Sequence, residues 1–202
     1  MALRVLTLGP SGSCHEAAVS HYLTANGLSG RSEILFTFDL VAGMDDLASG
    51  AVDLLVQCSA HPQVHLATER HHRQTPVVDT FIHPTKALAL LRRADRPQPR
   101  SLGLVAATAG YLDLDRFEHL HHEPSKPVVA EGLLADRYDA GLTHLEHAAA
   151  SDGQLVVVEV FGEVVTTWVV YGRKPRYAGQ LIGTESDDYL ASLFHFSAER
   201  GL

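Results

Sequence analysis

The 202-residue chain contains little of the chemistry that marks several common protein classes. Two cysteines, Cys14 and Cys58, are too few for a disulfide framework. No apolar run reaches the roughly 20 residues that a membrane-spanning helix needs. Lysine and arginine number 16 against 24 acidic residues, which gives a formal net charge of −8 without a basic cluster. Because acidic surfaces repel phosphate backbones, we expect neither nucleic acid nor membrane as a partner.

The N-terminus lacks the charged, apolar and cleavage regions of a signal peptide, since a strand-like apolar run begins at Leu3. We therefore predict a cytoplasmic protein in which both cysteines are reduced. The favoured interpretation of Cys14 and Cys58 is two small buried hydrophobic residues. A catalytic thiol is the alternative, because both cysteines follow predicted strands and are placed to line one cleft.

Strands and helices alternate along the first part of the chain, which is typical of a parallel sheet covered on both faces. The expected strands are 3–8, 33–38 and 52–57, and the expected helices are 15–25 and 40–49. Two extended segments, 76–83 and 86–93, come next and lead into a polar, proline-rich loop at 92–100. The second series after this loop has expected strands at 102–106 and 139–143 and expected helices at 109–119, 128–136 and 144–150. Two late strands, 154–160 and 164–171, and a last helix from Asp187 follow, and the strand 164–171 is expected to return to the first lobe.

Two series of this kind predict two α/β lobes with a cleft between them. We expect residues 1–83 plus 161–202 to form the first lobe and residues 84–160 to form the second. Ligands in such sheets bind beyond the carboxyl ends of the strands, so the loops that follow the strands are the places to look for chemistry.

Four segments, in sequence order, resemble the prephenate dehydratases. Residues 8–18 (LGPSGSCHEAA) resemble the family's opening strand, Leu-Gly-Pro turn and Ala-Ala helix. Residues 50–56 (GAVDLLV) resemble the Gly-x-Ala-Asp strand, and residues 131–144 the second-lobe helix and Ala-Leu-Thr strand end. Residues 164–173 (VVTTWVVYGR) stand where the family has Asn-x-Thr-Arg-Phe. The resemblance implies a two-lobed, type II periplasmic-binding-protein-like α/β fold, here without the regulatory ACT domain.

The chain departs from the dehydratases at the residues that carry their chemistry. The family's Pro-Ile-Glu-Asn-Ser loop is residues 58–62 (CSAHP) here, so Ala60 stands at the glutamate position and His61 at the asparagine position. Thr166 keeps the catalytic threonine position, but Thr167 replaces the arginine. Because an arginine grips a carboxylate bidentately, its loss argues against the dehydratase reaction.

The short prephenate decarboxylases of the bacilysin type are a closer likeness. They also lack the ACT domain, have alanine at the position of Ala60, and carry a Ser-Trp-x-Leu-Phe-Gly-Lys type segment that resembles residues 167–173. This resemblance implies a lyase of specialised-metabolite (antibiotic) biosynthesis that decarboxylates prephenate without aromatisation, to a hydroxycyclohexadienyl pyruvate. The related dehydratases are often dimers, so a homodimer is expected.

The expected site binds a small carboxylic acid. The residues Ser11 to Ser13 precede a helix, where free amides and the helix dipole favour an anion. Proton delivery to a ring carbon calls for a histidine, with His61 first and His144 second. The proposed catalytic residues are His61, Thr166 and His144. The proposed substrate-binding residues are Ser11, Gly12, Ser13, Cys58, Ser59, Ala60, Thr80, Lys86, Thr143, Thr167 and Trp168.

We expect no cofactor and no metal. The histidines at 61, 65, 71 and 72, and the group at 119–123, lack a zinc spacing such as His-Glu-x-x-His. Two other functions stay open: a residual prephenate dehydratase that forms phenylpyruvate, and a non-catalytic protein of the same fold that binds a small acid and releases it unchanged. Fold likeness alone does not decide among these.

Overall fold

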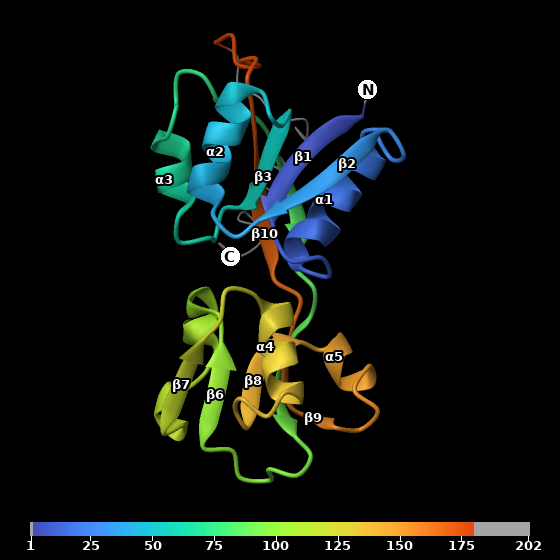
Figure 1. Cartoon of the computed structure of the whole chain (residues 1–202), viewed down its shortest axis with the longest axis vertical. Coiled ribbons are helices and arrows are strands. Elements are labelled where there is room, and N and C mark those ends of the chain that lie inside the picture. The colour runs from blue at the N-terminus through green and yellow to red at the C-terminus, as the bar shows by residue number, and fades with distance from the viewer. Residues whose placement is uncertain (1, 180–202) are drawn as a thin grey trace, which may run out of the picture.

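The computed structural model describes residues 2–179 and places them in two α/β lobes, one above the other in Figure 1. Each lobe contains one five-stranded sheet with helices packed against it. The chain crosses between the sheets through residues 85–87 and returns through residues 163–164. The predicted two-lobed α/β fold is thus confirmed, whereas division into units at 83/84 and 160/161 stays a prediction. The helix expected from Asp187 lies outside the described residues.

The first sheet has the strand order β2-β1-β3-β10-β4. Strands β1, β2 and β3 are parallel, and β10 runs antiparallel between β3 and β4. The strands are β1 Leu3–Leu8, β2 Ser32–Thr37, β3 Leu54–Cys58, β4 Val77–Pro84 and β10 Val165–Gly172. The helices of this lobe are α1 Cys14–Ala25, α2 Leu40–Ser49 and α3 Val64–Glu69. The last strand of the chain to be described therefore completes the sheet that the first strand begins.

The second sheet has the order β7-β6-β8-β5-β9. Strand β6 is parallel to β7 and β8, and β5 runs antiparallel between β8 and β9. The strands are β5 Leu88–Arg93, β6 Ser101–Leu104, β7 His119–His122, β8 Ala140–His144 and β9 Leu155–Gly162. The helices are α4 Lys126–Leu134 and α5 Glu146–Ala149. No helix within residues 2–179 is long and apolar enough to cross a bilayer.

The first sheet is covered on both faces because its strands are apolar at successive positions. Val5 of β1 packs with α1, whereas Leu6 and Leu8 pack with α2. Trp168 and Tyr171 of β10 divide between the same two clusters, and both are almost fully buried. Since successive side chains of a strand point to opposite faces, one apolar strand supplies two cores.

The helices that approach the space between the lobes begin at side-chain caps. The Ser13 side chain accepts a hydrogen bond from the Glu16 amide at the start of α1. The Ser125 side chain accepts one from the Val128 amide at the start of α4, which also carries Pro127 in its first turn. Such caps satisfy amides that have no partner inside the helix, and they set where each helix starts.

The predicted helix at 109–119 is wrong. Residues Ala106–Tyr111 and Leu114–Arg116 form two short 3₁₀ turns, and the chain then enters β7. The Asp113 side chain accepts a hydrogen bond from the amide of Asp115, which favours a turn over helix propagation. Strand β7 forms because β6 offers it a parallel partner, from Ser101 opposite His119 to Leu104 opposite His122. Helix α3 had no counterpart among the predicted elements.

Candidate functional site

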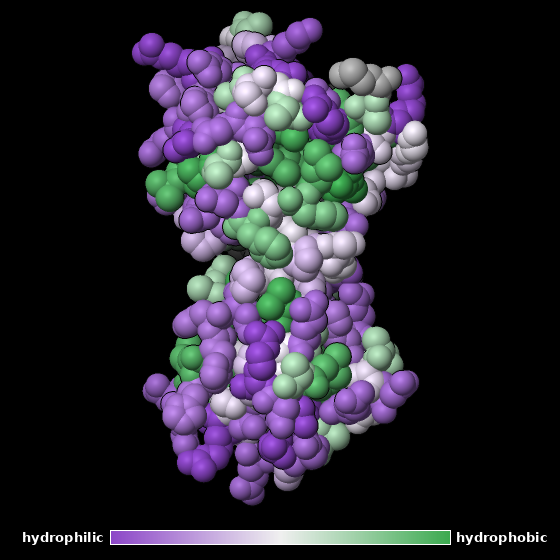
Figure 2. Space-filling model, in the orientation of Figure 1, coloured by the Kyte–Doolittle hydropathy of each residue, from purple (hydrophilic) through white to green (hydrophobic). Residues whose placement is uncertain are grey.

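A cavity of about 440 Å³ lies between the two lobes. It is bounded by the carboxyl ends of β1, β3 and β8 and by the starts of α1 and α4. On the face shown in Figure 2, the molecule narrows between the lobes, and apolar residues gather just above this waist. The lining residues are Leu8, Gly9, Ser13, Cys14, His15, Phe38, Cys58, Ala60, His61, Pro62, Gln63, Thr85, Leu88, Val105, Ala106, Ala107, Thr108, Tyr111, Glu123, Pro124, Ser125, Lys126, Pro127, His144, Val164 and Thr166.

The cavity is electropositive at one side. Helix α1 begins after Ser13 and helix α4 begins after Ser125, and both caps line the cavity. The dipole of a helix N-terminus favours a bound anion, and at α1 part of this effect is already used by Glu16, whose carboxylate accepts from the Gly12 amide. Lys126 adds a full charge, and it forms no ion pair within residues 2–179. Glu123, the one acidic residue of the lining, is held by Arg137 at 2.8 Å. These features suit an acidic ligand.

His61 lies half-buried on the loop after β3. Its Nδ1 accepts a hydrogen bond from the Gln63 amide at 3.2 Å, so the neutral ring carries its proton on Nε2. Burial lowers the pKa of His61 below its usual value. Ala60 and Pro62 flank it and are apolar. The loop thus presents one neutral N–H donor in an apolar setting.

Thr166 and Cys58 meet beside this loop. The Thr166 hydroxyl on β10 lies 3.7 Å from the Cys58 thiol at the end of β3, and both line the cavity. His15 lies next to them, and its Nε2 accepts a hydrogen bond from the Cys58 amide at 3.4 Å. The ring of His15 packs edge-on against Trp168, with centroids 5.0 Å apart. Burial, with smaller contributions from His61 and Lys126, lowers the pKa of His15 to about 3.

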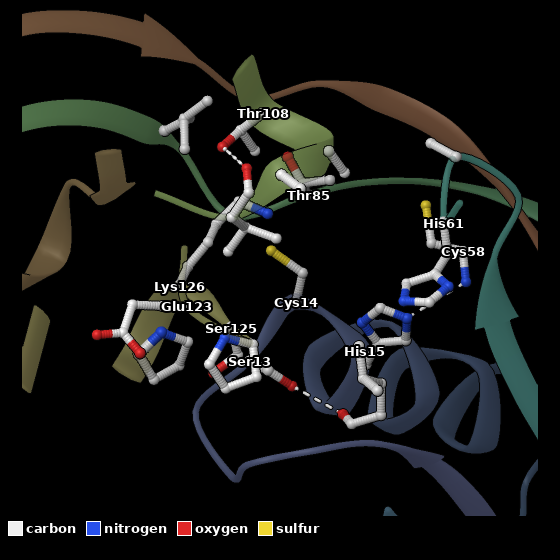
Figure 3. A pocket seen from close by; sticks show the side chains of 18 of the residues that line it. Ser13, Cys14, His15, Cys58, His61, Thr85, Thr108, Glu123, Ser125 and Lys126 are labelled. Carbon is white, nitrogen blue, oxygen red and sulfur yellow. Dashed lines mark hydrogen bonds between the residues drawn. The ribbon is translucent and has the colours of Figure 1, made fainter. Parts of the chain in front are cut away.

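A thiol and an imidazole join the lobes at the cavity wall. The Sγ atom of Cys14, in the first turn of α1, lies 3.1 Å from Nε2 of His144, the last residue of β8. Figure 3 shows Cys14 in the middle of the group, with Lys126 and Glu123 on one side and His15 and His61 on the other. Burial, then the charge of Lys126, lowers the pKa of His144 to about 3. The pairing could not be seen in the sequence, because 130 positions separate the two residues.

Six of the predicted site residues come together at this cavity, and the other eight do not line it. Those that line it are His61, Thr166, His144, Ser13, Cys58 and Ala60. Those outside the lining are Ser11, Gly12, Ser59, Thr80, Lys86, Thr143, Thr167 and Trp168. Hydrogen bonds and strand alternation explain where these eight residues lie instead.

The loop before α1 is occupied by the chain's own carboxylate. Glu16 accepts hydrogen bonds from the Gly12 amide at 2.6 Å and from the Ser11 hydroxyl at 2.9 Å. This carboxylate therefore takes the place that the sequence suggested for a ligand. Lys86 also turns to the protein, donating to the Gly12 carbonyl at 2.8 Å and pairing with Glu146 at 2.7 Å. It bridges the lobes without lining the cavity.

Three of the remaining side chains lie on β10 and its neighbour β4, outside the cavity lining. Thr167 is exposed on the face of β10 opposite Thr166, and its carbonyl accepts from the Ser59 amide. Trp168 is buried beneath the site, where its indole N–H donates to the His83 carbonyl. Thr80 donates to the carbonyl of Trp168 from the neighbouring strand.

Thr143 is fully buried on β8, and its hydroxyl donates to the Lys126 carbonyl at 2.6 Å. It therefore supports the start of α4 from behind. Lys126 and Ser125, which the sequence did not single out, carry the electropositive side of the cavity. A sequence signal for these residues was present. Ser-Lys-Pro before an apolar run is typical of a helix start, and helix starts attract anions.

Three solved structures share the fold at low identity. The prephenate dehydratase of Arthrobacter aurescens, in complex with L-Phe, is 16% identical with a TM-score of 0.63, and the match covers 89% of this chain and 62% of that one. The prephenate dehydratase of Staphylococcus aureus is 13% identical with a TM-score of 0.58, covering 98% and 80%. The periplasmic VFT2 domain of BvgS from Bordetella pertussis is 12% identical with a TM-score of 0.54, covering 85% and 80%.

These likenesses show that the chain has the two-lobed fold of prephenate dehydratases and of periplasmic Venus flytrap domains. The chain spans less than two thirds of the Arthrobacter protein. No family model matches the sequence, and neither does any curated protein.

Proposed function

We propose that the chain is a lyase that decarboxylates prephenate, or a prephenate-like acid, to a non-aromatic hydroxycyclohexadienyl pyruvate. The observation that carries the proposal is the polarity of the cavity. Lys126 and the starts of α1 and α4 lie on one side, while Ala60, Ala106 and Ala107 line it without any arginine from residues 2–179. A cavity of about 440 Å³ is in the range for small-molecule sites.

The two carboxylates of such a substrate meet different surroundings in this cavity. The pyruvyl carboxylate suits the Lys126 side, where an ammonium and helix amides stabilise charge. The ring carboxylate suits the apolar part of the lining, which includes Ala60, Ala106 and Ala107 and solvates charge poorly. Decarboxylation removes charge from that group, so a setting that disfavours the carboxylate favours the transition state more than the bound substrate.

The reaction breaks the bond between the ring and its carboxylate as carbon dioxide leaves. The electron pair of that bond enters the ring diene, a proton is added at a ring carbon, and the hydroxyl stays in place. His61 is the first candidate to supply that proton, because its Nε2 is free of protein partners in the described chain. A bound dianion favours the protonated imidazole and so offsets the effect of burial. Thr166, which also lines the cavity, is the candidate to hydrogen-bond the retained hydroxyl.

Purified protein mixed with prephenate at neutral pH and followed by proton NMR and carbon dioxide release tests the proposal. A hydroxydienyl pyruvate formed together with carbon dioxide supports it. Phenylpyruvate above the non-enzymatic background would establish the dehydratase alternative. Prephenate that binds and stays unchanged would establish a small-acid-binding protein, an alternative favoured by the paired helix N-termini and by the likeness to the VFT2 domain.

A further inference from the structure

Three potential metal ligands gather where β8 turns into α5. His144 is the last residue of β8, and Glu146 and His147 open the first turn of α5. One ligand atom from each residue lies within 4.8 Å of the others. The tight turn from strand to helix brings them together, so the group is local in sequence.

Two nitrogen atoms of these residues lack a hydrogen-bond partner in the described part of the chain. Within residues 2–179, Nδ1 of His144 and Nε2 of His147 are buried and form no hydrogen bond. The two rings lie nearly parallel, at 14° with centroids 5.8 Å apart, so neither ring donates to the other. His144 is only 1% exposed. Buried polar atoms are almost always satisfied, and two unsatisfied nitrogens in one cluster of potential ligands call for a partner.

We propose that His144, Glu146 and His147 bind a divalent transition-metal cation, zinc in the first place. Two imidazoles and one carboxylate are a ligand set that zinc takes, with a fourth position left for water. His144 would contribute Nδ1, His147 Nε2 and Glu146 a carboxylate oxygen. Glu146 is exposed, so its side chain is free to turn toward the two rings.

Lys86 is the competitor of the cation for Glu146. Its ammonium lies 2.7 Å from the carboxylate, and it also donates to the Gly12 carbonyl at 2.8 Å. Metal binding releases the first of these contacts and leaves the second available. Removal of the Lys86 charge is therefore expected to tighten metal binding, because it removes both the competition and a nearby like charge.

The metal would also act on the cavity wall. Nε2 of His144 faces the Cys14 thiol at 3.1 Å. A cation on Nδ1 requires the proton of the neutral ring to sit on Nε2, so that His144 donates to Cys14. The metal would thus orient a group that lines the cavity without itself entering the cavity.

Metal binding can be measured without any assumption about catalysis. The full chain, stripped with a chelator and dialysed, is titrated with zinc chloride against a chromogenic zinc chelator, and cobalt(II) is used in parallel for its visible absorption. We expect one cation per chain. The His147→Ala and Glu146→Gln variants should weaken binding at least roughly tenfold, and Lys86→Met should strengthen it.

His119→Ala is the matched control, because His119 is exposed on β7, far along the chain from the proposed ligands. Circular dichroism checks that each variant folds, and Glu146→Gln, at an exposed residue, keeps the test valid if His147→Ala prevents folding. Absence of stoichiometric binding at micromolar zinc would overturn the proposal. So would binding that survives both His147→Ala and Glu146→Gln, or that falls equally in His119→Ala.

Discussion

At the scale of the residue, the site is a set of imidazoles that their surroundings keep neutral. Burial lowers the pKa values of His15 and His144 to about 3 each, and it lowers the pKa of His61. The rings therefore act as hydrogen-bond donors and acceptors at neutral pH until a negative ligand arrives. A dianionic acid supplies the charge that makes a protonated imidazole favourable.

His61→Ala is expected to lower the turnover of prephenate at least roughly tenfold, because it removes the free N–H that faces the cavity. Product formation by proton NMR is the measurement. His65→Ala is the control, since His65 is exposed on α3 and does not line the cavity. Unchanged turnover in the His61 variant would assign proton delivery to another group, with His144 the next candidate.

His15 makes the stability of the protein depend on pH. Its pKa falls from 6.5 to about 3 on folding, so the unfolded chain binds the proton more readily. The contribution of neutral His15 to the free energy of unfolding is complete above pH 6.5 and is lost as the pH falls toward 3. The melting temperature should therefore fall between pH 7 and pH 5, a window in which carboxylates such as Asp45, with a pKa of about 2, stay ionised.

His15→Gln removes this titrating group while keeping an acceptor for the Cys58 amide. Thermal unfolding followed by circular dichroism should give a shallower pH dependence in the variant than in the parent chain. Parallel curves for the two proteins between pH 7 and pH 5 would show that His15 is protonated as easily in the folded state as in the unfolded one.

At the scale of the element, strand β9 stands out. It is one of the two edge strands of the second sheet, and four of its valines are between 36% and 54% exposed: Val156, Val157, Val158 and Val160. An apolar edge strand offers unpaired backbone groups together with apolar side chains, which favours pairing with another strand. We propose that the homodimer expected from the sequence forms through β9.

Light scattering coupled to size exclusion should give twice the 21.9 kDa of one chain. Val158→Lys is expected to shift the mass to that of the monomer, because it places a charge in the middle of the edge. Leu134→Lys, at the exposed end of α4, is the control with a similar change of charge. A monomer in the parent chain, or a dimer that persists in Val158→Lys, would exclude β9 as the interface.

At the scale of the whole molecule, the cavity exists only because two lobes face each other. Two polar contacts join the lobes beside the cavity: Cys14 with His144, and Lys86 with the Gly12 carbonyl. The starts of α1 and α4 belong to different lobes (Figure 1), so an anion bound between them is held by both. Ligand binding should therefore stabilise the pair of lobes against unfolding.

Lys126→Met is expected to weaken the binding of prephenate roughly tenfold or more, since it removes the full positive charge that lines the cavity. Isothermal titration and the ligand-induced rise in melting temperature measure this, whether or not the acid then reacts. Lys174→Met is the control, because that exposed lysine lies outside the lining. Equal affinities of the parent chain, Lys126→Met and Lys174→Met for prephenate would show that the acid binds away from Lys126.

The order of elements was predictable because it depends on local patterns. Apolar runs such as β1 and β3, and the start of a helix after Ser13, are visible along the chain. The prediction of a helix at 109–119 was wrong because the local helical pattern competed with pairing to the distant strand β6. His119–His122 became a strand only because β6 lies beside it, and sequence periodicity does not record such a neighbour.

The sequence by itself determined two α/β lobes, the loops that border the cleft, and the presence of His61, Thr166 and Cys58 among the lining residues. Tertiary structure alone decided that Lys126 supplies the charge of the cavity and that Thr143 supports the start of α4 from behind. It also decided that Cys14 meets His144. The physical reason is that hydrophobic periodicity acts over a few residues, whereas a side chain's partner depends on how separate elements pack.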